Sequence, residues 1–489
     1  MKKIYILGLI GLMVMTASEA KAQFDETNNL FYHTLRTPQS NQYNAAFFPT
    51  NNTFYLTFPG VDLQFGSPLA FNQIMYYDKK LNETVINLDT IFHNLTDGSA
   101  FRLNANVNIF GFGFKVSNMF FTFNTRMINN LSFGMPVSTI NALLHGNVDD
   151  NGDPRPVVEV LDGDILNATS YLETGIGMGY CFEPINLTVG LRAKLLYGIA
   201  NVQTDNTYVT FNTASSYDSV SARMYYEIQS ATCLPYDTTK KEFVWGGVGD
   251  LFRSGNMNTG IAFDLGAKYD FGPFTFSLAI NDLTAGIHWK SNVMTWRPEG
   301  GQGVIEFNGM DVATLLDHGT LNSDSISSYL QGKLESMKPM KVDSGDYWFS
   351  IPTKIDLGAS FSFAKLLRAG ILFHGQFDRG LLSKSNATSL DLSGNVTNTF
   401  RWNTTLTLGA NLFNWAEIIL GSSIVYDGSS MDFFNPGVGL IFTPATIVQT
   451  YIMADYISSF YLTESKAFNI KFGLNVLIGK GGRSIVSAL

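Results

Sequence analysis

Apolar and polar residues alternate with a period of two along most of the chain. In the stretch 260–271, for example, the odd positions include Ile261 and Phe263, whereas the even positions include Asp264 and Lys268. Such a strand has one oily face and one polar face, which suits lipid on the outside and a polar lumen on the inside. Because hydrocarbon cannot satisfy an unpaired strand edge, the strands must close on themselves. The pattern predicts an all-β fold, a closed antiparallel transmembrane β-barrel.

The strand candidates occur in pairs that are joined by short turns at one end and by long polar loops at the other, as in outer-membrane barrels. The candidates span residues 54–65, 102–116, 121–127, 174–182, 187–199, 260–271, 274–280, 354–363, 367–377, 400–412, 416–426, 437–442, 448–457 and 468–478. Weaker segments near 206–213, 222–230 and 302–308 raise the count toward sixteen. Since bacterial barrels usually have an even number of strands, we expect about fourteen.

Four regions lie outside this wall. Residues 1–22 have a basic start, an apolar core and a small-x-small end at Ala20-Lys21-Ala22, so we expect a secretory signal peptide that is cleaved near Ala22. Residues 23–52 are polar and are expected to form an N-terminal periplasmic or plug segment before a barrel at 53–489. Two loop insertions, 136–168 and 310–345, are expected to contain small helical pieces, for instance around Leu315 and Leu316.

The polar faces of the predicted strands carry a set of charged residues that we expect to face the lumen. These candidates are Arg102, Arg126, Arg192, Lys194, Asp264, Lys268, Lys354, Asp356, Arg368, Asp378, Arg401, Glu417, Asp455 and Lys471, together with the polar residue His374. Nine basic side chains against five acidic ones predict a basic lumen, although the chain as a whole has a net charge of −9. Two interpretations remain open: a lumen that attracts anionic head groups, and a structural network of paired charges.

Little in the sequence indicates catalysis. No two of the six histidines have metal-ligand spacing on one element, and no cofactor motif stands in a strand-turn-helix context. His374 and Asp378 share a face but lie about 13 Å apart along a strand, which is too far for a catalytic pair. We therefore predict no enzymatic activity, no metal and no cofactor, and the acidic balance argues against nucleic acid as a partner. A disulfide between Cys181 and Cys233 and two free thiols are both compatible with the sequence.

Two short stretches carry a family resemblance. The first stretch is Leu35-Arg36-Thr37-Pro38-Gln39-Ser40-Asn41-Gln42 with the following Asn44-Ala45-Ala46, and the second is the run 279–290. Both resemble an uncharacterised outer-membrane barrel family of Bacteroidota, known as a domain of unknown function. That family is distantly similar to the fatty-acid transporter FadL and to PorV-type barrels of type IX secretion. The resemblance implies fourteen strands and an N-terminal hatch. The hatch motif Asn-Pro-Ala of FadL-like proteins would correspond to Asn44, Ala45 and Ala46, so the proline is missing.

The sequence thus predicts a bacterial outer-membrane barrel that binds or passes a hydrophobic or amphipathic solute. One alternative is a non-conducting barrel that docks envelope proteins in a surface or type IX secretion assembly. A weaker alternative is a membrane-embedded hydrolase. Tryptophans such as Trp289, Trp402 and Trp415 fit the aromatic girdles at the two membrane interfaces, in contact with outer-membrane lipid, with buried packing as the other interpretation.

Overall fold

A computed structural model describes most of the predicted wall and part of the connections. The described residues are 30–34, 36–49, 52–67, 69–79, 82–87, 91, 100–134, 158–160, 166–213, 220–234, 236–237, 242–243, 257–298, 304–307, 316–317, 320–321, 339–342, 345–363, 366–377, 400–412, 415–426, 431–444, 447–456 and 466–479. The predicted signal peptide, residues 23–29 and most of the loop insertions lie outside these ranges. Within them, no helix is long and apolar enough to cross a bilayer.

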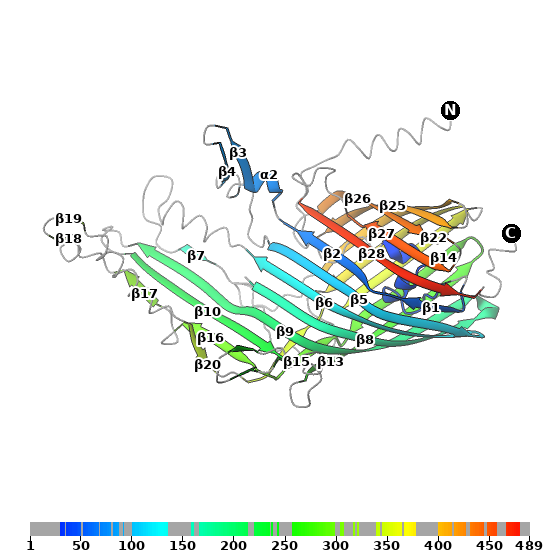
Figure 1. Ribbon diagram of the computed structural model, residues 1–489, viewed down its shortest axis with the longest axis horizontal. Helices are drawn as coiled ribbons and strands as arrows, with labels where there is room; N and C mark the ends of the chain where they lie inside the picture. Colours follow the sequence, from blue (N-terminus) through cyan, green and yellow to red (C-terminus); the bar gives the residue numbers. More distant parts are fainter. Residues whose placement is uncertain are drawn as a thin grey trace.

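The described strands form a closed antiparallel barrel of fourteen strands, as the alternation predicts (Figure 1). In order around the barrel they are β1 Phe54–Thr57 continued by β2 Gly60–Gly66, β5 Ala100–Val116, β6 Met119–Gly134, β8 Leu166–Phe182, β9 Leu187–Thr213, β13 Asn258–Phe271, β14 Phe274–Leu283, β22 Lys354–Phe363, β23 Leu367–Phe377, β24 Phe400–Leu412, β25 Ala416–Tyr426, β26 Met431–Phe442, β27 Val448–Ala454 and β28 Ala467–Ile478. The last strand closes the barrel because β28 pairs with both β1 and β2.

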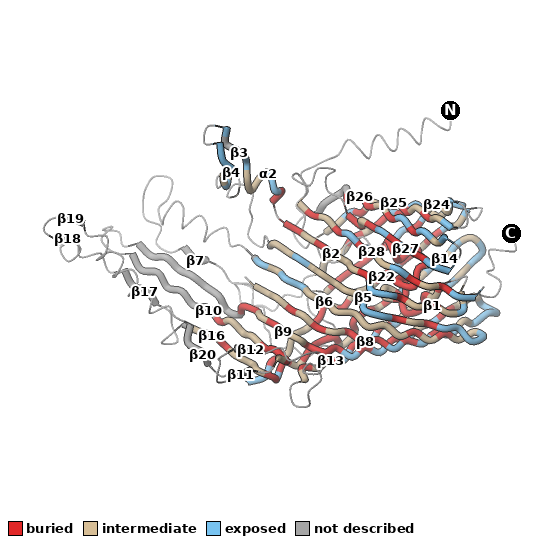
Figure 2. The backbone as a smooth tube through the Cα atoms, in the orientation of Figure 1, coloured by how far each residue is buried: buried red, intermediate tan, exposed pale blue. Residues whose placement is uncertain are grey.

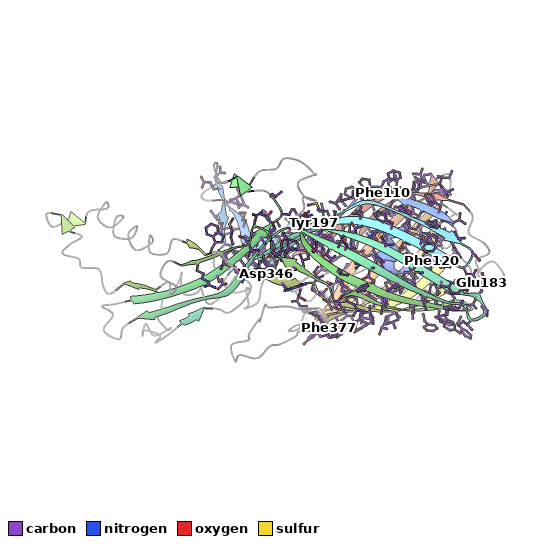
Figure 3. All side chains as sticks on the ribbon, turned by 90° about the horizontal axis from the view of Figure 1, so that it is seen from below. Phe110, Phe120, Glu183, Tyr197, Asp346 and Phe377 are labelled. Carbon is purple, nitrogen blue, oxygen red and sulfur yellow. The ribbon has the colours of Figure 1, made fainter. Side chains whose placement is uncertain are left out.

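One end of the barrel, here called the turn end, carries short connections. Ser117 and Asn118 join β5 to β6, residues 183–186 join β8 to β9, and Gly272-Pro273 joins β13 to β14. Asn186 and Gly272 have φ values of 51° and 58°, the left-handed conformation that Asn and Gly tolerate in tight turns. The other end, here called the loop end, receives the long connections. Figure 3 shows Glu183 at the turn end and Asp346 at the loop end.

The outer face of the wall is apolar. Side chains such as Ile176, Leu195, Ile261, Leu406 and Ile452 are more than half exposed, and they alternate with buried neighbours along each strand. The alternation of exposed and buried positions is visible along the strands in Figure 2. Because this exposed apolar surface encircles a closed barrel, it is suited to contact with lipid acyl chains.

The first wall strand changes parity at its middle. Phe58 and Pro59 both lie at exposed positions between β1 and β2, and the adjacent β5 has a register shift between Asn108 and Phe110. Proline cannot donate a ladder hydrogen bond, and a β-bulge accommodates the extra residue. As a result Tyr55 is buried before the bulge and Gln64 after it, although one has an odd and the other an even number.

An arm of sheet extends from the loop end. The loop-end half of β9 continues beyond the wall and pairs with β10 Val220–Thr232, which also pairs with β16 Met294–Pro298 and β17 Val304–Phe307. This arm projects away from the barrel on the left of Figure 1. It contains the three weak segments near 206–213, 222–230 and 302–308, which therefore add no strand to the barrel.

One expectation about the connections is wrong for the described residues. Leu316 lies in the strand β18 Leu316–Asp317, which pairs with β19 Thr320–Leu321, rather than in a helix. Trp289 is fully buried inside the barrel, because its strand folds inward, so for this residue the structure favours buried packing over an interfacial girdle. The first part of the other insertion, residues 136–157, lies outside the described residues. Cys181 and Cys233 are free thiols.

Candidate functional site

The described residues of the range 30–49 lie inside the barrel. This N-terminal segment contains two short 3-10 helices, η1 Leu30–His33 and η2 Pro38–Gln42, and most of its side chains are buried. Phe31 packs edge-on against Tyr451 of β27, and Tyr32 donates a hydrogen bond to Ser277 of β14. The segment therefore bridges strands on opposite sides of the lumen.

Wall side chains supply donors to the carbonyl groups of this segment. Arg192 of β9 donates to the carbonyl of Asn41, and Asn281 of β14 donates to that of Tyr43 at 2.8 Å. Arg368 of β23 donates to the carbonyl of His33 at 2.6 Å. An irregular segment has few internal partners for its backbone, and a buried carbonyl without a donor is costly. The wall thus provides the hydrogen bonds that a longer helix would otherwise make.

Asn44, Ala45 and Ala46, the predicted hatch motif, lie directly against two wall glycines. An added Cβ at Gly190 would overlap the carbonyl of Ala45, and one at Gly266 would overlap the Asn44 side chain and lie 2.5 Å from the Ala46 nitrogen. The Asn44 carboxamide accepts from the Ala46 nitrogen at 2.9 Å and donates toward the Leu278 carbonyl at 3.2 Å. The close approach of segment and wall depends on the missing side chains of these two glycines.

His33 is buried against the wall at Gly370, where an added Cβ would lie 2.8 Å from the imidazole. Burial, together with the nearby Arg368 guanidinium, lowers the pKa of His33 to about 3. The imidazole is therefore neutral in the seated segment at neutral pH and remains so in mild acid.

A row of paired charges crosses five neighbouring strands on the inner wall. Arg126 of β6 pairs with Glu173 of β8 at 2.9 Å, and Lys194 of β9 lies 3.8 Å from Glu173 and 2.8 Å from Asp264 of β13. Lys194 also lies 2.7 Å from Asp282, at the loop end of β14. Charges at this depth are tolerated only when they are paired, and these pairs follow the strand order around the barrel.

A second charged cluster lies across the lumen. Lys471 of β28 pairs with Asp455 at 2.5 Å and lies 3.6 Å from Asp62 of β2. Its ammonium also donates to the Tyr43 hydroxyl at 3.1 Å and lies 5.6 Å from the centre of the Phe31 ring. This cluster therefore ties the N-terminal segment to the side of the lumen opposite Asn281.

The remaining sequence candidates take varied positions. His374 pairs with Asp356 on the adjacent strand at 2.6 Å, Lys354 lies 3.8 Å from Asp282, Arg368 lies 3.9 Å from Glu417, and Lys268 pairs with Asp270 at 2.7 Å. Arg102 and Arg401 are half-buried and have contacts of their own. Asp378 lies outside the described residues.

Sequence reasoning missed several carboxylates that face these basic groups. Glu173 directly precedes the predicted start of its strand at residue 174. A strand predicted to begin one residue earlier would have included it on the inward face. Asp282 has the wrong parity for the lumen, but its φ of 61° turns the chain so that its carboxylate reaches Lys194. With Asp62 and Asp270 added, the charge balance of the described lumen is close to neutral, so the prediction of a basic lumen is wrong.

The charged row and the N-terminal segment enclose a polar cavity of about 40 Å³. Phe31, Gln39, Gln42 and Tyr43 line it from the segment. The wall contributes Val61, Asp62, Gln64, Asn106, Asn108, Arg126, Lys194, Asn281, Asp282, Lys354, Asp356, His374, Tyr451 and Lys471. This cavity, here called the chamber, has room for a few water molecules, which suits its polar lining.

An apolar cluster lies toward the loop end. Two short paired strands, β15 Gly286–Trp289 and β21 Tyr347–Ser350, fold inward from β14 and β22, and we call residues 285–289 and 346–351 the flap. The buried face of the flap packs against inward side chains of the wall. These contacts join Ala285, Ile287, Trp289, Tyr347 and Ile351 of the flap to Ile128, Tyr171, Leu196 and Ala262 of the wall and to Ala231 of β10 in the arm.

The His374–Asp356 pair bears on the hydrolase alternative. Asp356 orients the imidazole, but both residues are almost fully buried, and the Nε2 atom of His374 has no hydrogen-bond partner within the described part of the chain. A hydrolytic site would need a nucleophile within hydrogen-bond reach of that atom. The described residues place none there, and the prediction that the protein is not an enzyme stays a prediction.

The fold and the lumen define a class: a transmembrane β-barrel whose N-terminal segment lies inside the barrel. Comparison with family models then identifies the chain as a member of a family of unknown function, DUF5723, whose model matches residues 46–455. Comparison with curated proteins gives no match.

The chain has low similarity to several solved structures. The P. putida toluene transporter TodX is 9% identical, with 88% of this chain and 91% of that chain covered and a TM-score of 0.40. The CymD monoaromatic hydrocarbon channel is 7% identical, with 91% and 94% covered and a TM-score of 0.40. The COG4313 outer membrane channel from P. putida F1 is 7% identical, with 89% and 98% covered and a TM-score of 0.30. Similarity at this level does not establish the function of this chain.

Proposed function

We propose that the protein is a bacterial outer-membrane channel whose lumen is closed by the N-terminal segment and which admits an amphipathic solute when that segment moves. The closed wall with its apolar exterior suits the outer membrane, with the turn end toward the periplasm and the loop end outward. The observation that carries the proposal is the way the segment is held: by side-chain hydrogen bonds and close contacts, outside the strand ladders of the wall.

The lining of the lumen favours an amphipathic solute over a pure hydrocarbon. A solute that enters at the loop end meets the apolar surfaces under the flap and then the charged chamber. A hydrocarbon would lose nothing by leaving water but would have to displace water from paired charges in the chamber, which is unfavourable. A solute with an apolar part and a polar end can contact both regions in turn.

The test uses the wall glycines. Gly190→Ala places a methyl group where the Ala45 carbonyl now lies, so the segment must move, while the chain keeps its full length. Gly409→Ala is the matched control, since its added Cβ would meet its nearest atom at 3.7 Å, an ordinary contact. We expect proteoliposomes of Gly190→Ala to take up 2-naphthalenesulfonate at least tenfold faster than the wild type, and Gly409→Ala to match the wild type. Equal uptake by all three proteins would contradict the proposal.

A docking role remains as a second candidate because the described lumen is occupied by the segment, as a non-conducting barrel would require. The same experiment separates the two functions. A barrel that only docks other envelope proteins would lose the seated segment in Gly190→Ala, detected by faster proteolysis of residues 30–49, and still admit no solute. A channel gains both protease sensitivity and uptake.

A further inference from the structure

The inner wall has a flat recess beneath the flap. Gly198 of β9 and Gly260 of β13 lie on neighbouring strands, and an added Cβ at Gly198 would lie 2.6 Å from the Trp289 indole. An added Cβ at Gly260 would overlap the carbonyl of Gly286. The recess is thus shaped by two missing side chains, and in this structure the flap fills it with an aromatic ring.

The indole fits this recess imperfectly. Trp289 is fully buried, yet its Nε1 donor has no acceptor within the described residues. A buried donor without a partner loses its hydrogen bond to water and gains nothing in return, which weakens the closed arrangement. A group of the same shape without such a donor would occupy the recess more favourably.

The flap is attached in a way that permits it to lift. A single register pair, Thr259 with His288, joins it to β13. The flap also donates a side-chain hydrogen bond to β9, from Tyr347 to Asn201 at 2.5 Å. At its base, Thr284 has a φ of 58°, an uncommon conformation for a β-branched residue and one that marks a bend in the backbone.

We infer that the recess is a binding site for the planar apolar part of an amphipathic solute and that Trp289 occupies this site in the closed form. Ile128, Tyr171, Leu196 and Ala262 would surround the bound ring, with Gly198 and Gly260 beneath it. The inference rests on the proposed function, because it assigns the entry site for the solute. Asp282, at the base of the flap, pairs with Lys194 in the chamber, so lifting the flap also exposes the charged row to the polar end of the solute.

The first test measures binding at equilibrium. Trp289→Ala removes the internal occupant and leaves a ring-sized apolar cavity, the kind of site that binds aromatic molecules. With the full chain in nanodiscs, we expect Trp289→Ala to bind 2-naphthalenesulfonate at least tenfold more tightly than the wild type. The control is Trp402→Ala, a half-buried wall residue stacked on Phe373, which should match the wild type. Equal affinity of Trp289→Ala and the wild type would overturn the inference.

The second test does not disturb packing under the flap. Thr259 and His288 are directly paired, so Thr259→Cys with His288→Cys can form a disulfide that fixes the flap to β13. The control is His288→Cys with Trp348→Cys, a pair within the flap. Both are made in the Gly190→Ala background, with Cys181 and Cys233 replaced by serine and alanine.

We expect oxidation to reduce naphthalenesulfonate uptake at least tenfold in the first pair, with recovery under a reductant, and to leave the second pair unchanged. Uptake that is unaffected by the Thr259–His288 disulfide overturns the flap site and leaves the channel function intact. Absence of uptake by both Gly190→Ala cysteine variants in the presence of the reductant overturns the channel function, and the flap site with it.

Discussion

The two inserts in the lumen differ in how far polar contacts hold them. The N-terminal segment combines apolar contacts of Leu30 and Phe31 with wall donors on its carbonyls, and the Arg192 and Arg368 guanidinium groups are among those donors. The flap is held by apolar contacts around Ile287 and Trp289, both fully buried. Polar contacts are sensitive to charge and pH, whereas apolar contacts are sensitive to apolar ligands. The two inserts can therefore move under different conditions.

The charged chamber between the inserts should be the most sensitive region. Lys194→Met leaves Glu173, Asp264 and Asp282 in the lumen without their shared cation, and such a loss costs about 3–5 kcal/mol of unfolding free energy. Urea unfolding in lipid measures the change. The control is Lys268→Met, whose partner Asp270 is one-third exposed. A Lys194→Met protein as stable as the wild type would show that the charged row is dispensable.

The apolar attachment of the flap predicts a cavity effect. Ile287→Ala removes three buried carbons from the flap and should lower the unfolding free energy by about 2–4 kcal/mol, in the range for buried Ile. Hydrogen exchange should show faster exchange in residues 285–289 and unchanged exchange in residues 30–49. Equal acceleration in both inserts would mean that the two are coupled and that the comparison fails.

The polar attachment of the segment predicts acid sensitivity. The pKa of His33 is about 3 when seated, against about 6.5 when released, so only the released form takes up a proton between these values. Stability of the seated form is therefore highest above pH 6.5 and declines below it, by about 2 kcal/mol between pH 7.5 and 5. Proteolysis of residues 30–49 should accelerate over this range in the wild type. The increase should be absent in His33→Gln. If His33→Gln shows the same pH profile as the wild type, a group other than His33 causes the acid sensitivity.

The smallest effect is expected at the turn end. Lys268 and Asp270 are partly exposed, with side-chain exposures of 14% and 33%, and form their ion pair on a single strand. Exposed pairs contribute about 0–1 kcal/mol, so Lys268→Met should change unfolding by less than about 1 kcal/mol. Double-mutant analysis with Asp270→Asn provides the measurement. A loss as large as that of Lys194→Met would contradict the ranking of buried over exposed pairs.

The sequence predicted the wall because period-two alternation is a local property that a lipid-facing strand must have. It identified Lys194, Asp264 and Asp356 as residues of one parity, and the structure brings each of them against an ionisable partner. It could not predict Asp282 or Trp289, because both depend on the inward fold at the end of β14, where left-handed backbone angles reverse the parity. Nor could it predict the recess at Gly198, which exists only where β15 meets the wall.

Single-channel current through a planar bilayer tests the closed lumen most directly. In the double variant Gly190→Ala and Gly266→Ala, two added methyl groups overlap the Ala45 carbonyl and the Asn44 side chain, so the segment must move away from the wall. We predict discrete openings for this variant and a silent membrane for the wild type and for Gly409→Ala. Openings of the same size in all three proteins, or silence in all three, would contradict a lumen closed by residues 30–49.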